Sequence, residues 1–391
     1  MNRLIYLSTV AVQALVSLVL LPVLTHNLPK EQFGTITLVA TSQQLATMAL
    51  GLGTPQLISR FQVLSRSVAH GFGTCMALLT IAGLGLVALL HDPESVIVPL
   101  ATGNAIIALS LSRLRAQDRA LPWAALSIGA GPVAQCTGAA LVVLGAGLSG
   151  YLGAWLGVVL AVTLLSLVWA DRAWFVRPTG AALRHLVRLG GPLSLSAVAL
   201  VAFTSGDRIV VAQVINHEAA GQYQAFYTLG NLSSFATTAL FSYWMPRLLM
   251  GRSPARFRLE IAVLALGGAI ASVVASFVLL PGSYHPAEHW PIAVIAALSA
   301  IPYGLTLEFE CRYVRALATA RFGSITTVGA LLSIAATALV ARTTGDLQLV
   351  ALMTPVTYLI LAAVLHLAAR GLPVEPPADP TESLAEELIP A

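Results

Sequence analysis

Charged side chains are scarce in this chain. Only 10% of its 391 residues are Asp, Glu, Lys or Arg, and 57% are hydrophobic, whereas a typical soluble domain carries about 25% charged residues. This composition excludes an ordinary soluble globular protein. Since one helical membrane crossing takes about 20 apolar residues, the chain has room for about twelve crossings and little else.

Several kinds of catalytic machinery are also missing. The single lysine, Lys30, follows a proline, so the chain has no GxxxxGK phosphate loop and no ATP motor of that type. The three cysteines form no CxxC pair. The run from His285 to His289 matches the HxxEH pattern of zinc proteases, but it lies in a short loop rich in proline, where the stable helix that zinc catalysis needs is not expected. We therefore expect no metal and no cofactor.

Apolar stretches recur along the chain and predict an all-α integral membrane protein with twelve transmembrane helices. They fall at 4–25, 35–57, 68–90, 96–112, 122–145, 150–170, 191–215, 224–245, 259–280, 290–307, 322–341 and 347–369. Turn-forming runs such as Thr344-Gly345-Asp346 separate them. One helix, with Gly153 and Gly157, carries a GxxxG pattern that predicts close helix packing.

The basic residues are distributed unevenly between the two sides of this predicted topology. Eighteen of the 21 lie at the N-terminus, in the even-numbered loops or in the tail, among them Arg258 in the loop before residue 259. Because cytoplasmic loops carry the excess of Lys and Arg, both termini are expected in the cytoplasm. The acidic, proline-rich segment 371–391 is expected to be a disordered cytoplasmic tail.

The chain contains an internal repeat. Residues 27–34 resemble residues 214–221 at an offset of 187, with Gly34 matching Gly221 and Glu31 matching Glu218. We expect each glycine at a tight turn or helix start that a side chain would obstruct, and each glutamate near a helix N-terminus. Six helices in each half place both halves in the same orientation, which predicts two parallel six-helix bundles facing a central cavity. The expected units are 1–170, a cytoplasmic linker at 171–190, 191–370 and the tail.

These features resemble a known family, the polysaccharide transporters or Wzx-type flippases of the multidrug/oligosaccharidyl-lipid/polysaccharide exporter superfamily. The residues that carry the resemblance are Leu21-Pro22-Val23-Leu24, Glu31-Gln32-Phe33-Gly34, Gly51-Leu52-Gly53 with Arg60, Asp207-Arg208-Ile209-Val210-Val211 and Ala220-Gly221-Gln222-Tyr223. The resemblance implies an alternating-access carrier, and not an enzyme, that turns polyprenyl-diphosphate-linked oligosaccharides across a bacterial cytoplasmic membrane. It also implies a proton or sodium ion as a coupling partner, and polysaccharide polymerases or glycosyltransferases as neighbours. The first helix contains no acid, which departs from related antiporters.

Asp207 and Arg208 are the sharpest candidates for a functional site because their repeat counterparts lie inside the first helix, which places both charges within the membrane. Charge there is costly and usually faces the bundle interior or a wet cavity. On the functional interpretation, Arg208 binds the lipid diphosphate and Asp207 balances it when substrate is absent. Asp207 is also a candidate for binding a proton or cation. On the alternative interpretation, the two residues form a fixed ion pair between helices.

A second candidate set lies near the cytoplasmic ends of the helices. Arg60, Arg113 and Arg312 are candidates for capture of the diphosphate at the cytoplasmic mouth, or they only satisfy the positive-inside rule. Glu308 is four residues before Arg312, a spacing that predicts a pair on one helix face. Asn104 belongs to a group of polar residues within the spans that either line a sugar-compatible cavity or join helices by hydrogen bonds.

Two alternative functions stay open at this point. An exporter of small amphipathic or cationic compounds on the same fold would have a cavity dominated by Asp207 and Glu308, whereas an anionic diphosphate requires arginines that point inward. An integral-membrane enzyme of polysaccharide assembly would have a large outward loop or a clustered catalytic dyad, and neither is visible in the sequence.

Overall fold

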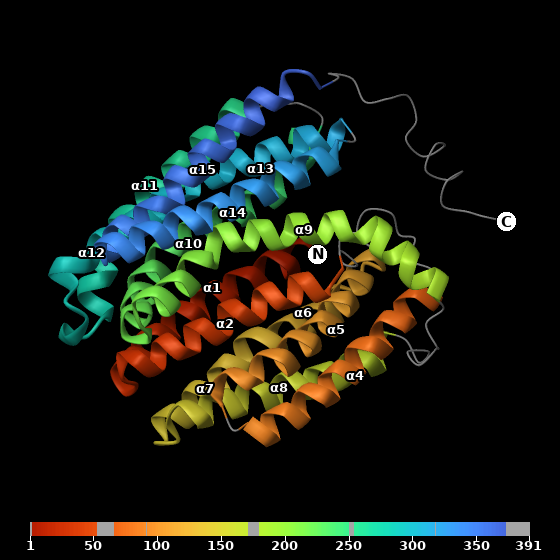
Figure 1. Cartoon of the computed structure of the whole chain (residues 1–391), viewed down its shortest axis with the longest axis horizontal. Helices are drawn as coiled ribbons and strands as arrows, with labels where there is room; N and C mark the ends of the chain where they lie inside the picture. The colour runs from red at the N-terminus through yellow and green to blue at the C-terminus, as the bar shows by residue number, and fades with distance from the viewer. Residues whose placement is uncertain are drawn as a thin grey trace.

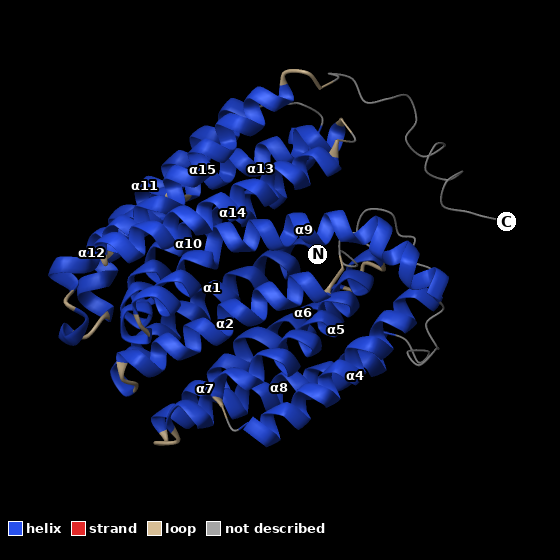
Figure 2. Cartoon of the chain, viewed as in Figure 1, coloured by secondary structure: helices blue, strands red, loops and turns tan. Residues whose placement is uncertain are grey.

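The structure is a computed structural model that describes residues 2–52, 66–90, 92–170, 180–249, 254–316 and 318–372. Within these ranges the chain is almost entirely helical and contains no strand (Figure 2). Residues 171–179 of the predicted linker and 373–391 of the predicted tail lie outside the described residues, as does Arg60. Residues 180–190 of the predicted linker are helical and form the start of the helix Gly180–Val210.

Long helices follow one another along both halves of the chain (Figure 1). The first half contains α1 (Asn2–Asn27), α2 (Lys30–Leu50), α4 (Arg66–Leu90), η1 (Pro93–Val96), α5 (Ile97–Ala116), α6 (Ala120–Ile128), η2 (Gly129–Val133), α7 (Ala134–Val143) and α8 (Gly147–Ala170). The second half contains α9 (Gly180–Val210), η3 (Val211–Ile215), α10 (His217–Leu249), α11 (Pro254–Leu279), η4 (Gly282–Tyr284), α12 (Pro286–Leu298), α13 (Ala300–Arg315), α14 (Thr319–Thr344) and α15 (Leu347–Ala369).

Nine helical segments of the described chain are long and apolar enough to span a membrane. Among the other helices, α1 contributes a shorter apolar segment, Ala11–Asn27, and α2 and α10 interrupt their apolar residues with polar ones such as Gln43 and Asn231. The start of α1 and the end of α15 lie at the same end of the molecule (Figure 1). The protein is therefore a multi-pass membrane protein of helical architecture.

Two segments combine regular helix with a π-helical turn. In the segment Ala120–Val143, η2 contains Pro132, which has no backbone N–H to donate to the preceding turn. In the second half, η3 follows α9 and ends at Asn216, whose backbone is extended. Wide turns of this kind are frequent at functional sites, and η3 begins three residues after Arg208.

The two halves meet where α2 crosses α10, where α2 and α4 contact α9, and where α1 contacts α10. Gly34 and Gly221 lie at the crossing. A Cβ on Gly34 would come within 1.8 Å of the His217 carbonyl oxygen, and one on Gly221 within 2.1 Å of the Lys30 carbonyl oxygen. His217 and Lys30 are themselves related by the repeat offset, so the contact is reciprocal.

This geometry agrees with the second of the two alternatives for the glycines and with the expectation for the glutamates. Gly34 and Gly221 lie near the starts of α2 and α10 and not in turns, and a side chain at either position would obstruct the contact of the two backbones. Glu31 and Glu218 do lie in the first turns of α2 and α10, where the helix dipole favours a carboxylate. The crossing is reinforced between halves by the Lys30–Glu218 ion pair, at 3.7 Å, and by a 3.1 Å hydrogen bond between Thr35 Oγ1 and His217 Nδ1.

The expectation of close packing at Gly153 and Gly157 is wrong. Neither glycine has any other side chain or neighbouring helix within 4 Å of the position where a Cβ would stand. Both are exposed on α8. The GxxxG pattern would permit another helix to pack closely here, but no helix of the described residues does so.

Replacing Gly34 or Gly221 by alanine is predicted to disrupt the crossing, because a methyl group at either position overlaps the opposing backbone. We expect a lower melting temperature in detergent for each variant, by an amount that corresponds to about 1–3 kcal/mol of overpacking. Gly153→Ala is the matched control, and we expect it to be neutral or slightly stabilising. Equal melting temperatures for all three variants would contradict the close contact.

Candidate functional site

Asp207 and Arg208 lie near the C-terminal end of α9, within the candidate span Ser194–Ile215. The Asp207 side chain is buried, with 5% of its surface exposed, and Arg208 is half-buried. The prediction that this pair lies inside the helical bundle agrees with these positions.

Three donors surround the Asp207 carboxylate. Its Oδ1 accepts the backbone N–H of Arg208 at 2.9 Å. Its Oδ2 accepts the Tyr223 hydroxyl from α10 at 2.5 Å and the Thr354 hydroxyl from α15 at 3.2 Å. One carboxylate therefore joins α9, α10 and α15 through hydrogen bonds to a charged acceptor, which are stronger than those between neutral groups.

Hydrogen bonds join Asp207 to α10 and α15, and the choice between a substrate site and a structural role for Asp207 and Arg208 stays a prediction. Hydroxyl groups hold Asp207, and no ion pair of the described chain includes either Asp207 or Arg208. The contacts with Tyr223 and Thr354 could not be read from the sequence, because they join residues 16 and 147 positions away from Asp207.

Arg208 is held by an aromatic face. Its guanidinium carbon is 4.4 Å from the centre of the Tyr227 ring, a cation–π contact worth about 0.5–2 kcal/mol. Tyr227 stacks on Tyr223, with ring centres 5.6 Å apart, and donates its hydroxyl to the Thr204 carbonyl oxygen at 3.1 Å. The Nε atom of Arg208 is buried and has no hydrogen-bond partner among the described residues. The arrangement fixes a cation and leaves a donor for an acceptor that the described residues do not supply.

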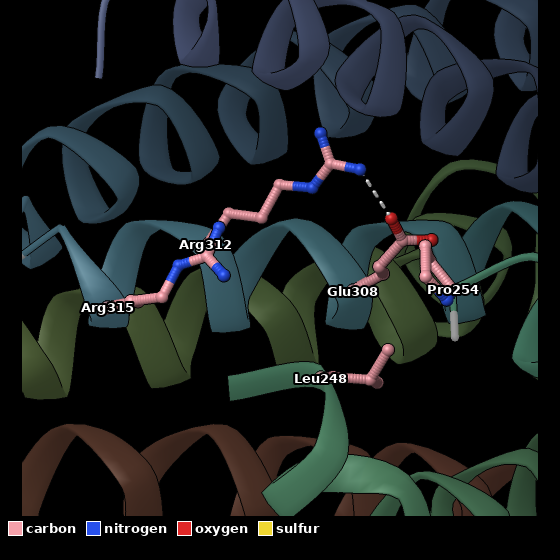
Figure 3. Close-up of a pocket in the computed structure, with 5 residues that line it drawn as sticks. All are labelled: Leu248, Pro254, Glu308, Arg312 and Arg315. Atoms are coloured by element: carbon pink, nitrogen blue, oxygen red, sulfur yellow. Dashed lines mark hydrogen bonds and ion pairs between the residues drawn. The ribbon is translucent and has the colours of Figure 1, made fainter. Parts of the chain in front are cut away.

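Glu308 on α13 forms a second charged cluster. Its side chain is 2% exposed and accepts from Arg258 on α11, at 2.7 Å from Nε and 2.8 Å from Nη2. Arg312 Nη2 donates to the same carboxylate at 2.8 Å (Figure 3). The predicted pair of Glu308 and Arg312 is present. The contribution of Arg258 was missed because this residue was assigned to a loop, whereas α11 already begins at Pro254.

Asn104 and Arg113 both lie on α5 in the first half, on a different helix from either cluster. Asn104 Nδ2 donates to the Leu100 carbonyl oxygen of its own helix at 2.8 Å. The expected alternatives for Asn104 were a cavity contact or a bond between helices, and this bond is neither. Arg60 lies outside the described residues. The structure thus brings Glu308 to Arg312, but it does not join the six described candidates in one site.

Solved structures share this fold over nearly its whole length. The lipid II flippase MurJ in an inward closed conformation has a TM-score of 0.67 and 12% identity, over 95% of this chain and 88% of that one. A multidrug resistance MATE family transporter in an inward-facing conformation has a TM-score of 0.62 and 14% identity, over 95% and 98%. A transporter from Pyrococcus furiosus, whose binding pocket is described as having reverse polarity, has a TM-score of 0.57 and 14% identity, over 94% of each chain.

At these identities the likeness concerns the fold, which is that of the MOP superfamily of transporters. The chain itself belongs to the polysaccharide biosynthesis protein family, whose profile matches residues 1–251. No curated protein matches the sequence. The family and the fold agree with the resemblance found in the sequence.

Asp207→Asn is predicted to destabilise the protein. The amide keeps the shape of the side chain but replaces one acceptor oxygen with a donor, which then faces the donor groups that Asp207 now accepts. Leaving buried polar groups unpaired costs about 1–3 kcal/mol, so we expect a clearly lower melting temperature by tryptophan fluorescence. The control is Glu288→Gln, because the Glu288 side chain is 72% exposed. Equal melting temperatures would show that the three bonds contribute nothing.

Proposed function

We propose that the protein is an alternating-access flippase that moves a polyprenyl-diphosphate-linked oligosaccharide, a precursor of a cell-surface polysaccharide, across the bacterial cytoplasmic membrane. Membership in the polysaccharide biosynthesis protein family supports the substrate class. A protein described as a lipid II flippase shares the fold, which supports a lipid-linked substrate. We also propose that the protein lies in the bacterial cytoplasmic membrane with both termini in the cytoplasm.

One observation supports the substrate class above all: the buried acidic side chains have partners, whereas a buried donor of Arg208 has none among the described residues. The Asp207 carboxylate is occupied by three donors, and that of Glu308 is neutralised by two arginines. Arg208, in contrast, retains a buried Nε donor without an acceptor among the described residues. A site of this kind favours an anion such as a diphosphate over the cations that a multidrug exporter on the same fold would carry.

The position of Arg208 suits a transport pathway. It lies on α9 and contacts Tyr227 of α10. Helix α2 of the first half contacts both α9 and α10, and α1 contacts α10. Of the helices outside the nine candidate spans, α1, α2 and α10 all lie at this junction. We propose that they are the remaining three of twelve crossings, and that their polar side chains line a central cavity between two parallel six-helix bundles, 1–170 and 191–370.

We propose that the same junction between the halves permits the motion that alternating access requires. The halves contact one another through backbone at Gly34 and Gly221, at the end of α2 opposite to the chain termini. We propose that this close backbone contact within the α2–α10 interface acts as a pivot, about which the two bundles rock while each keeps its own packing. Substrate, a coupling proton or sodium ion, and neighbouring polymerases or glycosyltransferases are the partners that the proposal requires.

Arg208→Gln is predicted to lower flipping of a polyprenyl-diphosphate-linked sugar in proteoliposomes by about tenfold or more, because a charge-assisted bond to the diphosphate is lost. The control is Arg184→Gln, an exposed arginine on the same helix. Both variants are compared at equal amounts of reconstituted protein. If Arg208→Gln flips as fast as Arg184→Gln, Arg208 does not contact the substrate.

A further inference from the structure

A pocket lies beside the Glu308 cluster. Its lining residues come from the end of α10, the start of α11 and the C-terminal half of α13: Leu248, Pro254, Glu308, Arg312 and Arg315 (Figure 3). The cavity has a volume of about 110 Å³. This exceeds the space of a few water molecules but is far below the 300–1,000 Å³ of sites for drug-sized ligands, so the pocket suits a compact group and not a whole oligosaccharide.

The charges at this pocket do not cancel. Arg258 and Arg312 share the single carboxylate of Glu308, and Arg315 has no ion-pair partner among the described residues. Two guanidinium groups, those of Arg312 and Arg315, therefore line the pocket together with one carboxylate, which Arg258 also binds from outside the lining. The Glu308 side chain is 2% exposed, whereas the side chains of Arg258 and Arg312 are 46% and 34% exposed. The excess positive charge thus lies on the accessible side of the cluster.

The depth of the pocket points to a lipid headgroup. One candidate span begins at Pro254 and another ends at Arg315, and both residues line the pocket. A cavity at the boundary of two spans lies at the level where phosphate groups of lipids are found. Basic pockets between transmembrane helices are general binding sites for such headgroups, and guanidinium forks match the oxygen atoms of phosphate.

We propose that this pocket binds the phosphate of an anionic lipid through Arg312 and Arg315, with Glu308 as the internal counter-ion that holds Arg258 and Arg312 when the pocket is empty. Phosphate and Glu308 then compete for the same donors. Two lipids offer this chemistry: the diphosphate of a polyprenyl carrier, in which case the inference rests on the proposed function, and an ordinary anionic phospholipid of the bilayer.

The test uses the full chain in phosphatidylcholine nanodiscs, with inorganic pyrophosphate as the probe and the melting temperature as the measure of binding. We expect a saturable rise in melting temperature for the unmodified chain. Arg315→Gln is expected to weaken pyrophosphate binding by about tenfold, the loss of one hydrogen bond between charged groups. Arg321→Gln, which removes an exposed arginine from α14 outside the pocket, is the matched control and is expected to change little.

The pyrophosphate affinity of Glu308→Gln distinguishes a phosphate-binding pocket from a purely structural role of Glu308, Arg258 and Arg312. Removing the competing carboxylate frees donors of two arginines, so pyrophosphate is expected to bind several-fold more tightly even where the empty variant melts earlier. A structural ion pair alone predicts no gain in affinity. Absence of saturable binding by the unmodified chain, or equal affinity of Arg315→Gln and Arg321→Gln, would overturn the proposal, and these two results do not depend on the folding of Glu308→Gln.

Competition distinguishes the two sources of phosphate. Nanodiscs that contain a few per cent of polyprenyl diphosphate or, separately, of phosphatidylglycerol are titrated with pyrophosphate. Reduced pyrophosphate binding with only the first lipid assigns the pocket to the carrier, and reduced binding with phosphatidylglycerol assigns it to a bilayer lipid. Neither lipid having an effect would overturn the assignment to a lipid headgroup. Saturable pyrophosphate binding by a chain that flips no substrate would retain a phosphate-binding pocket and reject the proposed function.

Discussion

The close approach of α2 and α10 is the constraint on which the relation between the two halves depends. Two helix backbones touch there because neither Gly34 nor Gly221 has a side chain. The contact brings α2 and α10, whose apolar residues are interrupted by polar ones, to the junction of the halves beside α9. A helix pair that tolerated larger residues at these positions would stand farther apart and would not position Tyr223 and Tyr227 of α10 beside α9 in the same way.

Charge inside the bundle obeys a second constraint, since each buried ionisable group needs partners in a medium without water. Asp207 meets it with three donors on three different helices, and Glu308 meets it with two guanidinium groups. Arg208 meets it only in part, through the face of Tyr227. The contrast between satisfied acids and an incompletely satisfied cation is what supports the proposal of an anionic substrate.

Much of the architecture could be predicted from the sequence, because a membrane imposes length and polarity on every crossing. The apolar windows, the repeat and the Glu308–Arg312 spacing depend on local pattern, and the helices and that ion pair follow them. Contacts between distant segments could not be predicted in the same way. The hydrogen bond from Thr354 to Asp207 and the ion pair from Arg258 to Glu308 depend on how helices pack. The GxxxG pattern at Gly153 is the opposite case, because this local motif predicted a contact with another helix that is not found among the described residues.

The most direct test of the account is transport by the unmodified chain in proteoliposomes loaded on one leaflet with a fluorescent polyprenyl-diphosphate-linked sugar. The account predicts saturable translocation above that of protein-free vesicles, with competition by unlabelled polyprenyl diphosphate and none by lipophilic cations. Translocation equal to that of protein-free vesicles, together with accumulation of a lipophilic cation by the same preparation, would contradict the assignment of this protein as a lipid-linked glycan flippase.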